Sequence, residues 1–175
     1  MKMKVQEMNV DNKRIVLRCD FNVPIKNGVI LDDTKIVASL ETINYLVSKN
    51  CRVIILSHLG KVKSEEDKVK NSLAVVAKRL NELVESNVIF STTTRSPELE
   101  MRVKALQPRE ILVVENTRFE DYPQKLESGN DIQLASYWAS LGDIFVMDAF
   151  GSSHRCHAST AGIAKFLPSC IGFLV

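Results

Sequence analysis

Short apolar runs rich in β-branched residues recur along the chain and predict buried strands. Six such runs occupy residues 13–20, 51–57, 87–91, 110–115, 143–147 and 171–175. The run at residues 143–147, DIFVM, is apolar at nearly every position instead of alternating with polar residues. That pattern is typical of a parallel strand covered on both faces.

Between these runs, apolar residues recur at the spacing of one face of a helix. The spacing predicts helices over residues 34–47, 72–84, 96–106 and 130–141, and a short one from Ser159 or Thr160 to Phe166. Ser72 and Ser96 stand where helix caps are expected, and Pro97 suits a first helical position. Residues 63–70 are expected to form a polar, mobile linker, and Asn27-Gly28 to form a turn.

Alternating strands and helices indicate an α/β fold, here a three-layer Rossmann-like domain. We expect residues 1–175 to form a single domain with a mainly parallel six-stranded sheet and helices on both faces. Right-handed crossovers would bring the carboxyl ends of all the strands to one edge, which is where such sheets bind ligands.

Composition adds limits to this picture. A net charge of +2 is too mild to indicate nucleic-acid binding, and aromatic residues, at 6%, are not interleaved with the basic ones. No apolar run approaches the length of a membrane span, and the N-terminus lacks a signal-peptide core. The cysteines lie far apart without zinc-type spacing, at Cys19, Cys51, Cys156 and Cys170. We therefore expect reduced cysteines, no metal site, a cytoplasmic location, and neither nucleic acid nor membrane as a partner.

Polar and basic residues gather where the predicted strands end. They are Arg18, Asp20 and Asn22, then His58 and Lys61, then Arg118, and finally His154, Arg155 and His157, with Lys35 early in the first helix. Arginine matches carboxylate and phosphate oxygens, and lysine and histidine add compact or switchable charge. A small dianion that carries a phosphate and a carboxylate would suit this cluster. No P-loop and no GxGxxG motif indicates a nucleotide cradle in the chain.

Each of these residues also has a purely structural interpretation. Asp20 would then cap a turn, His58 would be a hydrogen-bonded core histidine, and Arg118 would pair with Glu115 or Glu120. Their shared position at one predicted edge favours the binding interpretation over the structural one.

Five stretches of the sequence resemble phosphoglycerate kinase. They are LRCDFNVP at residues 17–24, SHLGK at 57–61, ENTRF at 115–119, DAFGSSHRCHAST at 148–160 and AKFLPS at 164–169. The resemblance covers nearly the whole chain but only the N-terminal domain of that family. It implies that a C-terminal domain, which binds Mg-ATP or Mg-ADP in the full-length enzyme, is absent from this chain.

The resemblance assigns roles to individual positions. It implies that 3-phosphoglycerate is bound by Arg18, Asp20, Asn22, Lys35, His58, Lys61, Arg118, His154, Arg155 and His157. Lys35 stands at the position of a family arginine that stabilises the transferring phosphoryl group, so the resemblance implies a catalytic role for it. The implied partners are 3-phosphoglycerate and the protein's own C-terminal domain.

Two lysines depart from the family pattern, because Lys35 and Lys61 stand where the family has arginine. Lysine keeps the charge and loses the bidentate geometry. Met147 also replaces the asparagine of the family's VNDAFG sequence. The two lysines count against full activity or mark a diverged member of the family. Because the nucleotide-binding domain is absent from this chain, we expect the chain alone to bind 3-phosphoglycerate weakly and to be inactive. The alternative is a stand-alone or degenerate anion-binding domain without kinase activity.

Overall fold

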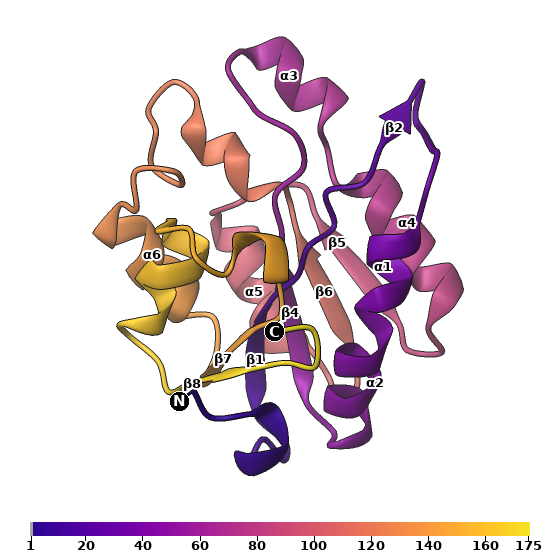
Figure 1. Ribbon diagram of the computed structural model, residues 1–175, viewed down its shortest axis with the longest axis vertical. Helices are drawn as coiled ribbons and strands as arrows, with labels where there is room; N and C mark the ends of the chain where they lie inside the picture. The colour runs from indigo at the N-terminus through magenta and orange to yellow at the C-terminus, as the bar shows by residue number, and fades with distance from the viewer. Residues whose placement is uncertain (1) are drawn as a thin grey trace.

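The computed structural model describes residues 2–175 and is built around a six-stranded parallel sheet (Figure 1). Its strands, in spatial order, are β5 (Val88–Ser91), β6 (Ile111–Val114), β4 (Arg52–Leu56), β1 (Arg14–Arg18), β7 (Ile144–Met147) and β8 (Ser169–Ile171). Every neighbouring pair is parallel. The predicted fold class is therefore confirmed.

Helices cover both faces of the sheet (Figure 1). One face carries α1 (Thr34–Ala38), α2 (Leu40–Ser48) and α4 (Ala74–Leu83), and the other carries α5 (Pro97–Ala105), α6 (Ile132–Ala139) and the π-helical turn η4 (Ala158–Gly162). Two apolar cores result because successive strand side chains point to opposite faces. In β1, for example, Leu17 packs in the core beneath α2 and Val16 in the core beneath α6.

A single helix was expected over residues 34–47, but the structure breaks it at Ser39. The hydroxyl of Ser39 donates to the carbonyl of Ile36 at 2.6 Å. Such back-bonding competes with the backbone ladder and bends a helix. The break therefore has a local side-chain cause that periodicity alone does not show.

The expectation of a mobile linker over residues 63–70 was wrong, because helix α3 (Glu65–Lys70) occupies most of it. Ser64 caps the helix by accepting from the backbone of Asp67 at 3.2 Å. Acidic residues fill the first turn and lysines the last, which suits the helix macrodipole. The ammonium of Lys68 also lies over the Tyr122 ring, 5.7 Å from its centroid. This polar segment is thus ordered by capping and charge instead of by apolar burial.

A two-stranded hairpin flanks the predicted turn at Asn27-Gly28. Strands β2 (Ile25–Lys26) and β3 (Val29–Ile30) pair antiparallel, and both turn residues have positive φ, 52° at Asn27 and 75° at Gly28. Positive φ at both central residues is the signature of a tight hairpin turn. The turn was therefore predicted correctly, and its short strands were missed.

The last strand lies earlier than expected, at Ser169–Ile171 instead of 171–175. After Gly172 the backbone amides bond to side chains: Phe173 donates to the Thr42 hydroxyl at 3.1 Å and Leu174 to the Asp148 carboxylate at 3.0 Å. Gly172 permits this path because a Cβ there would lie 2.2 Å from the Asp148 Oδ1. Across residues 2–175, the structure contains no helix with the length and apolar character that crossing a membrane requires.

Gly172→Ala tests this close approach. We expect the free energy of unfolding to fall by about 1–3 kcal/mol, since the added methyl overlaps a carboxylate in a packed interior. Urea denaturation followed by circular dichroism measures the change. Gly151→Ala is the matched control, because its Cβ would meet the Asp20 Oδ2 at an ordinary 3.5 Å. Equal unfolding free energies for the two variants would contradict the close packing of Gly172 on Asp148.

Candidate anion-binding site

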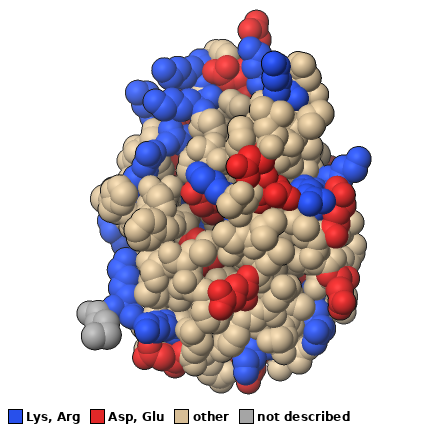
Figure 2. Space-filling model, turned by 45° about the vertical axis from the view of Figure 1, so that its right-hand side comes forward, with Lys and Arg blue, Asp and Glu red and all other residues tan. Residues whose placement is uncertain are grey.

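The predicted site residues do follow the ends of the strands. Because all six strands are parallel, the segments after β1, β4, β6 and β7 leave the sheet at the same edge. These segments carry eight of the ten residues singled out from the sequence, while Arg18 is the last residue of β1 and Lys35 belongs to α1. On the face of the molecule drawn in Figure 2, lysines and arginines gather along one border while acidic side chains lie mostly elsewhere.

Arg18, the last residue of β1, lies beneath this edge with its side chain fully enclosed. Its Nε donates to the Ser159 Oγ at 2.9 Å, its Nη1 donates to the Cys19 carbonyl, and its Nη2 lies 2.9 Å from the His58 Nδ1. Burial lowers the pKa of Arg18, and the nearby Glu127 carboxylate is the largest opposing influence. Arg18 therefore supports the site from below.

His58 is almost completely buried and lies among the cations of the site. Burial is the main cause that lowers its pKa to about 3, and the positive charges of Arg18, Arg118, Arg155 and His157 add to the effect. At neutral pH the imidazole is therefore neutral, and His58 is a hydrogen-bonding group instead of a cation. Its contact with Arg18 agrees with the structural interpretation of a hydrogen-bonded core histidine, and it also places His58 beside the basic side chains of the cluster.

Two further side chains of this cluster have enclosed nitrogens without protein partners among the described residues. They are the Nε of Arg118 and the Nδ1 of His157. The Arg118 Nη1 lies 3.6 Å from the Asp121 carboxylate, so the predicted pairing with Glu115 or Glu120 is not found. Burial lowers the pKa of His157, opposed by Glu127 and assisted by Arg118, Arg18 and Arg155. The Arg118 Nε is thus an unpartnered donor beside other cations, which is an arrangement that an anionic ligand would complete.

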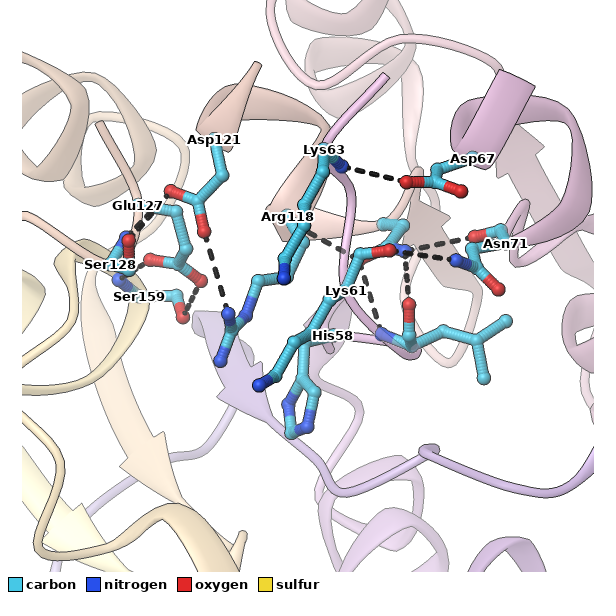
Figure 3. Close-up of polar contacts among 12 residues, drawn as sticks. His58, Lys61, Lys63, Asp67, Asn71, Arg118, Asp121, Glu127, Ser128 and Ser159 are labelled. Atoms are coloured by element: carbon cyan, nitrogen blue, oxygen red, sulfur yellow. Dashed lines mark hydrogen bonds and ion pairs between the residues drawn. The ribbon is translucent and has the colours of Figure 1, made fainter. Parts of the chain in front are cut away.

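Lys61 and Arg118 line a groove of about 490 Å³ at this edge. Figure 3 shows the Lys61 ammonium and the Arg118 guanidinium directed toward the space beside the His58 ring. Lys61 is exposed, as is Arg155. The exposed cations of Lys61 and Arg155 thus lie beside the buried His58 ring and the enclosed Nε of Arg118.

A second group of predicted residues lies just after β1. It consists of Asp20 and Asn22 from the loop that follows this strand, and Lys35 from α1. The Lys35 ammonium lies 3.2 Å from the Asp20 Oδ2, and the Asp20 Oδ1 accepts from the backbone of Asn22 at 3.1 Å. The Asn22 Oδ1 accepts from the backbone of Gly60 at 2.9 Å, which ties this group to the segment that follows β4. Asp20 therefore both caps a turn and orients a cation.

His154 is exposed, and no side-chain contact joins it to the other predicted residues in the described part of the chain. It shares the loop with Arg155 but is not among the charges that act on His58. The structure therefore places nine predicted residues in or beside the cluster and leaves His154 apart.

Two side chains that matter for the site were missed from the sequence. Asn116 is fully buried, accepts from the backbones of Leu59 and Arg118 at 3.1 and 3.0 Å, and donates to the carbonyls of Leu59 and Asn71 at 2.7 and 2.9 Å. It thereby fixes the segment after β4 against the one after β6. Its position two residues before Arg118, directly after a strand, was an available signal.

Glu127 is the second missed residue, and it is also fully buried. Its carboxylate accepts from the backbone and the hydroxyl of Ser159, at 2.8 and 2.6 Å (Figure 3). It lay in a stretch that sequence pattern assigned to a polar loop, where burial is not expected. Within residues 2–175, no group of three or more His, Cys, Asp and Glu side chains is arranged to hold a metal ion.

The low pKa of His58 predicts how stability depends on pH. Its pKa is about 3 in the folded chain and 6.5 when exposed, so between these values the unfolded chain binds more protons and stability falls as pH falls. His58→Gln removes this titration. We expect its free energy of unfolding to lose about 2 kcal/mol less than the wild type between pH 6.5 and about pH 4.5. Urea denaturation at several pH values measures both slopes, and parallel curves would refute a neutral His58.

Comparison with known proteins places this geometry in a family. The sequence model described as phosphoglycerate kinase matches residues 5–175. A phosphoglycerate kinase of Listeria innocua is 54% identical over 174 residues, which are 99% of this chain and 44% of that protein. One from Lacticaseibacillus casei is 52% identical over 175 residues, again 44% of its length.

Comparison with solved structures finds the same family as comparison of the sequences. The phosphoglycerate kinase of Coxiella burnetii matches with a TM-score of 0.84 at 38% identity, over 99% of this chain and 42% of that one. The enzyme of Pyrococcus horikoshii matches with a TM-score of 0.84 at 30% identity, over 98% of this chain and 42% of that one. The chain thus spans less than half the length of the relatives it matches. It belongs to the phosphoglycerate kinase family.

Proposed function

We propose that this chain is the 3-phosphoglycerate-binding, N-terminal domain of a phosphoglycerate kinase. In the complete enzyme, which acts in glycolysis, a phosphoryl group is exchanged between the pair ATP and 3-phosphoglycerate and the pair ADP and 1,3-bisphosphoglycerate. The observation that carries the proposal is the convergence of the Arg18, Arg118 and Arg155 cations on His58, with the largely neutral His157 beside them. Such a concentration of positive charge at the carboxyl edge of a parallel sheet favours binding of an anion.

The roles of the side chains follow from their chemistry. Arg118 and Arg155 provide planar forks of donors that match phosphate or carboxylate oxygens, and Lys61 adds a point charge. His58 is neutral and contributes an N–H without adding charge. Asn22 and Asp20, held by the turn after β1, are suited to the hydroxyl and carboxylate end of the substrate. His157 completes the enclosed floor, and His154, on the same loop, approaches only if the loop closes on the ligand.

Lys35 is the catalytic residue of the proposal. Its ammonium is half exposed and is held by the Asp20 carboxylate at 3.2 Å, so it extends from α1 over the edge of the sheet. In phosphoryl transfer the protein acts mainly by positioning the reactants and stabilising the charge on the transferred group. A lysine supplies that charge without the two-pronged geometry of arginine.

The nucleotide belongs to another part of the enzyme in this proposal. The relatives are more than twice as long as the match, which is 44% of their length. We assign Mg-ATP and Mg-ADP to a C-terminal domain and no residue of this chain to them. The 175 residues alone then bind 3-phosphoglycerate weakly and transfer no phosphoryl group. The partners are this substrate and the C-terminal domain, with no nucleic acid or membrane, and the location is cytoplasmic.

Arg118→Ala and Arg155→Ala test the substrate site. Each should weaken 3-phosphoglycerate binding by roughly tenfold or more, because one charge-assisted contact is lost, while folding is nearly unchanged. Isothermal titration of the 175-residue chain measures the affinity. Arg109→Ala is the control, since Arg109 is in a turn before β6, at the opposite edge of the sheet. Unchanged affinity in the Arg118 and Arg155 variants would exclude this site.

Lys35→Arg and Lys61→Arg test the two lysines. If both contact the ligand, the planar guanidinium should tighten 3-phosphoglycerate binding by about threefold each, because bidentate pairing replaces a single contact. The same titration measures the change, with Lys78→Arg on α4 as the matched control. Affinities equal to that of the Lys78 variant would remove Lys35 and Lys61 from the site, and would favour a degenerate anion-binding domain.

A further inference from the structure

A buried chain of hydrogen bonds runs from Glu127 to the site. Glu127 accepts from the Ser159 backbone at 2.8 Å and from the Ser159 hydroxyl at 2.6 Å, and its own carbonyl accepts from Ala158 at 2.9 Å. Glu127, Ser159 and Arg18 are each completely buried. The proposed function assigns no role to this carboxylate, although a buried charge is costly unless a partner compensates it.

The direction of the hydrogen bonds is fixed by the chemistry of the donors. The Arg18 guanidinium has only donors, so the Ser159 Oγ must accept from the Arg18 Nε at 2.9 Å. The single proton of the Ser159 hydroxyl then points to the Glu127 carboxylate, which is acceptor-only when ionised. Because Glu127 accepts the hydroxyl proton of Ser159, the Ser159 Oγ can act as the hydrogen-bond acceptor for Arg18.

The same reasoning extends to His58. The Arg18 Nη2 lies 2.9 Å from the His58 Nδ1, and because the guanidinium donates, Nδ1 must accept. A neutral imidazole that accepts at Nδ1 carries its proton on Nε2. Among the residues that the structure describes, no protein atom hydrogen-bonds to this Nε2. The ring therefore keeps one N–H donor available to the site.

We propose that Glu127 is a positioning residue which, through Ser159 and Arg18, holds His58 in the Nε2–H tautomer, so that the site presents a neutral N–H donor to its anionic ligand. The identity of that ligand as 3-phosphoglycerate rests on the proposed function, and the tautomer does not. A donor of this kind adds a hydrogen bond to an anion without adding to the mutual repulsion of the neighbouring cations.

The alternative role for Glu127 is electrostatic. As a negative charge it opposes the fall in the pKa of Arg18 and of His157. Removing it would then make the cluster more positive and would strengthen anion binding. If Glu127 acts by positioning, its removal weakens anion binding instead. Arg18 then loses the acceptor that fixes its orientation, and His58 loses the donor that fixes its tautomer. The sign of the change in affinity therefore separates the two roles.

The tautomer is tested first, in the 175-residue chain without ligand. Two-bond ¹H–¹⁵N correlation spectra at neutral pH should show His58 with one protonated nitrogen, Nε2, and one acceptor nitrogen, Nδ1. In Glu127→Gln and in Ser159→Ala the two nitrogen shifts should move toward each other, as expected for mixed tautomers. Unchanged His58 nitrogen shifts in both folded variants, or an Nδ1–H tautomer in the wild type, would overturn the proposal.

Binding is tested second, by isothermal titration with 3-phosphoglycerate. Glu127→Gln and Ser159→Ala should each weaken binding by roughly tenfold, the value of a lost contact to a charged group. Glu120→Gln is the control, since its carboxylate is nearly buried but pairs with Arg95 at 2.7 Å. Tighter binding by Glu127→Gln would refute positioning. If the wild type shows the Nε2–H tautomer but does not bind 3-phosphoglycerate, the proposed function is refuted. The positioning of His58 by Glu127 through Ser159 and Arg18 is then still supported.

Discussion

An enclosed guanidinium at the end of β1 is the constraint around which this site is arranged. Arg18 cannot lose its proton, so burial requires acceptors on every side. Those acceptors come from segments far apart in the chain, namely His58 after β4 and Ser159 after β7, with Glu127 behind Ser159. Satisfying one buried charge thus brings three loops to a fixed relative position. The exposed cations that face a ligand are attached to those same loops.

The site therefore has a rigid floor and an exposed rim. Asn116 joins the segments after β4 and β6 through three hydrogen bonds, and Arg18 joins those after β4 and β7. Lys61 and Arg155 lie above this floor with their charges in solvent. The hydrogen bonds of Arg18 and Asn116 hold the ligand-facing donors in place before the ligand binds, which reduces the conformational entropy that binding must remove. The lysine and arginine rim supplies the attraction.

The sequence predicted most of the sheet but only part of the site. Apolar runs and helical spacing predicted five of the six sheet strands and the edge at which the polar residues meet, because burial of an apolar pattern fixes both, and they placed the last strand too late in the chain. Helix α3 was missed because capping at Ser64 and paired charges, not apolar burial, hold it. Glu127 and Asn116 were missed because their burial depends on contacts 32 and 57 residues away, which no local pattern encodes. Whether His58 is charged could likewise not be read from its residue type.

The central claim is that charges from separate strand ends bind one small dianion together. The most direct measurement is the change in backbone and side-chain NMR shifts of the 175-residue chain as 3-phosphoglycerate is added, with glycerol as the uncharged reference. The account predicts simultaneous shifts, with one common dissociation constant, at Asn22, His58, Arg118 and Arg155, and none with glycerol. Shifts confined to one loop, different constants at different loops, or shifts centred on the opposite edge of the sheet near Arg109 would contradict it.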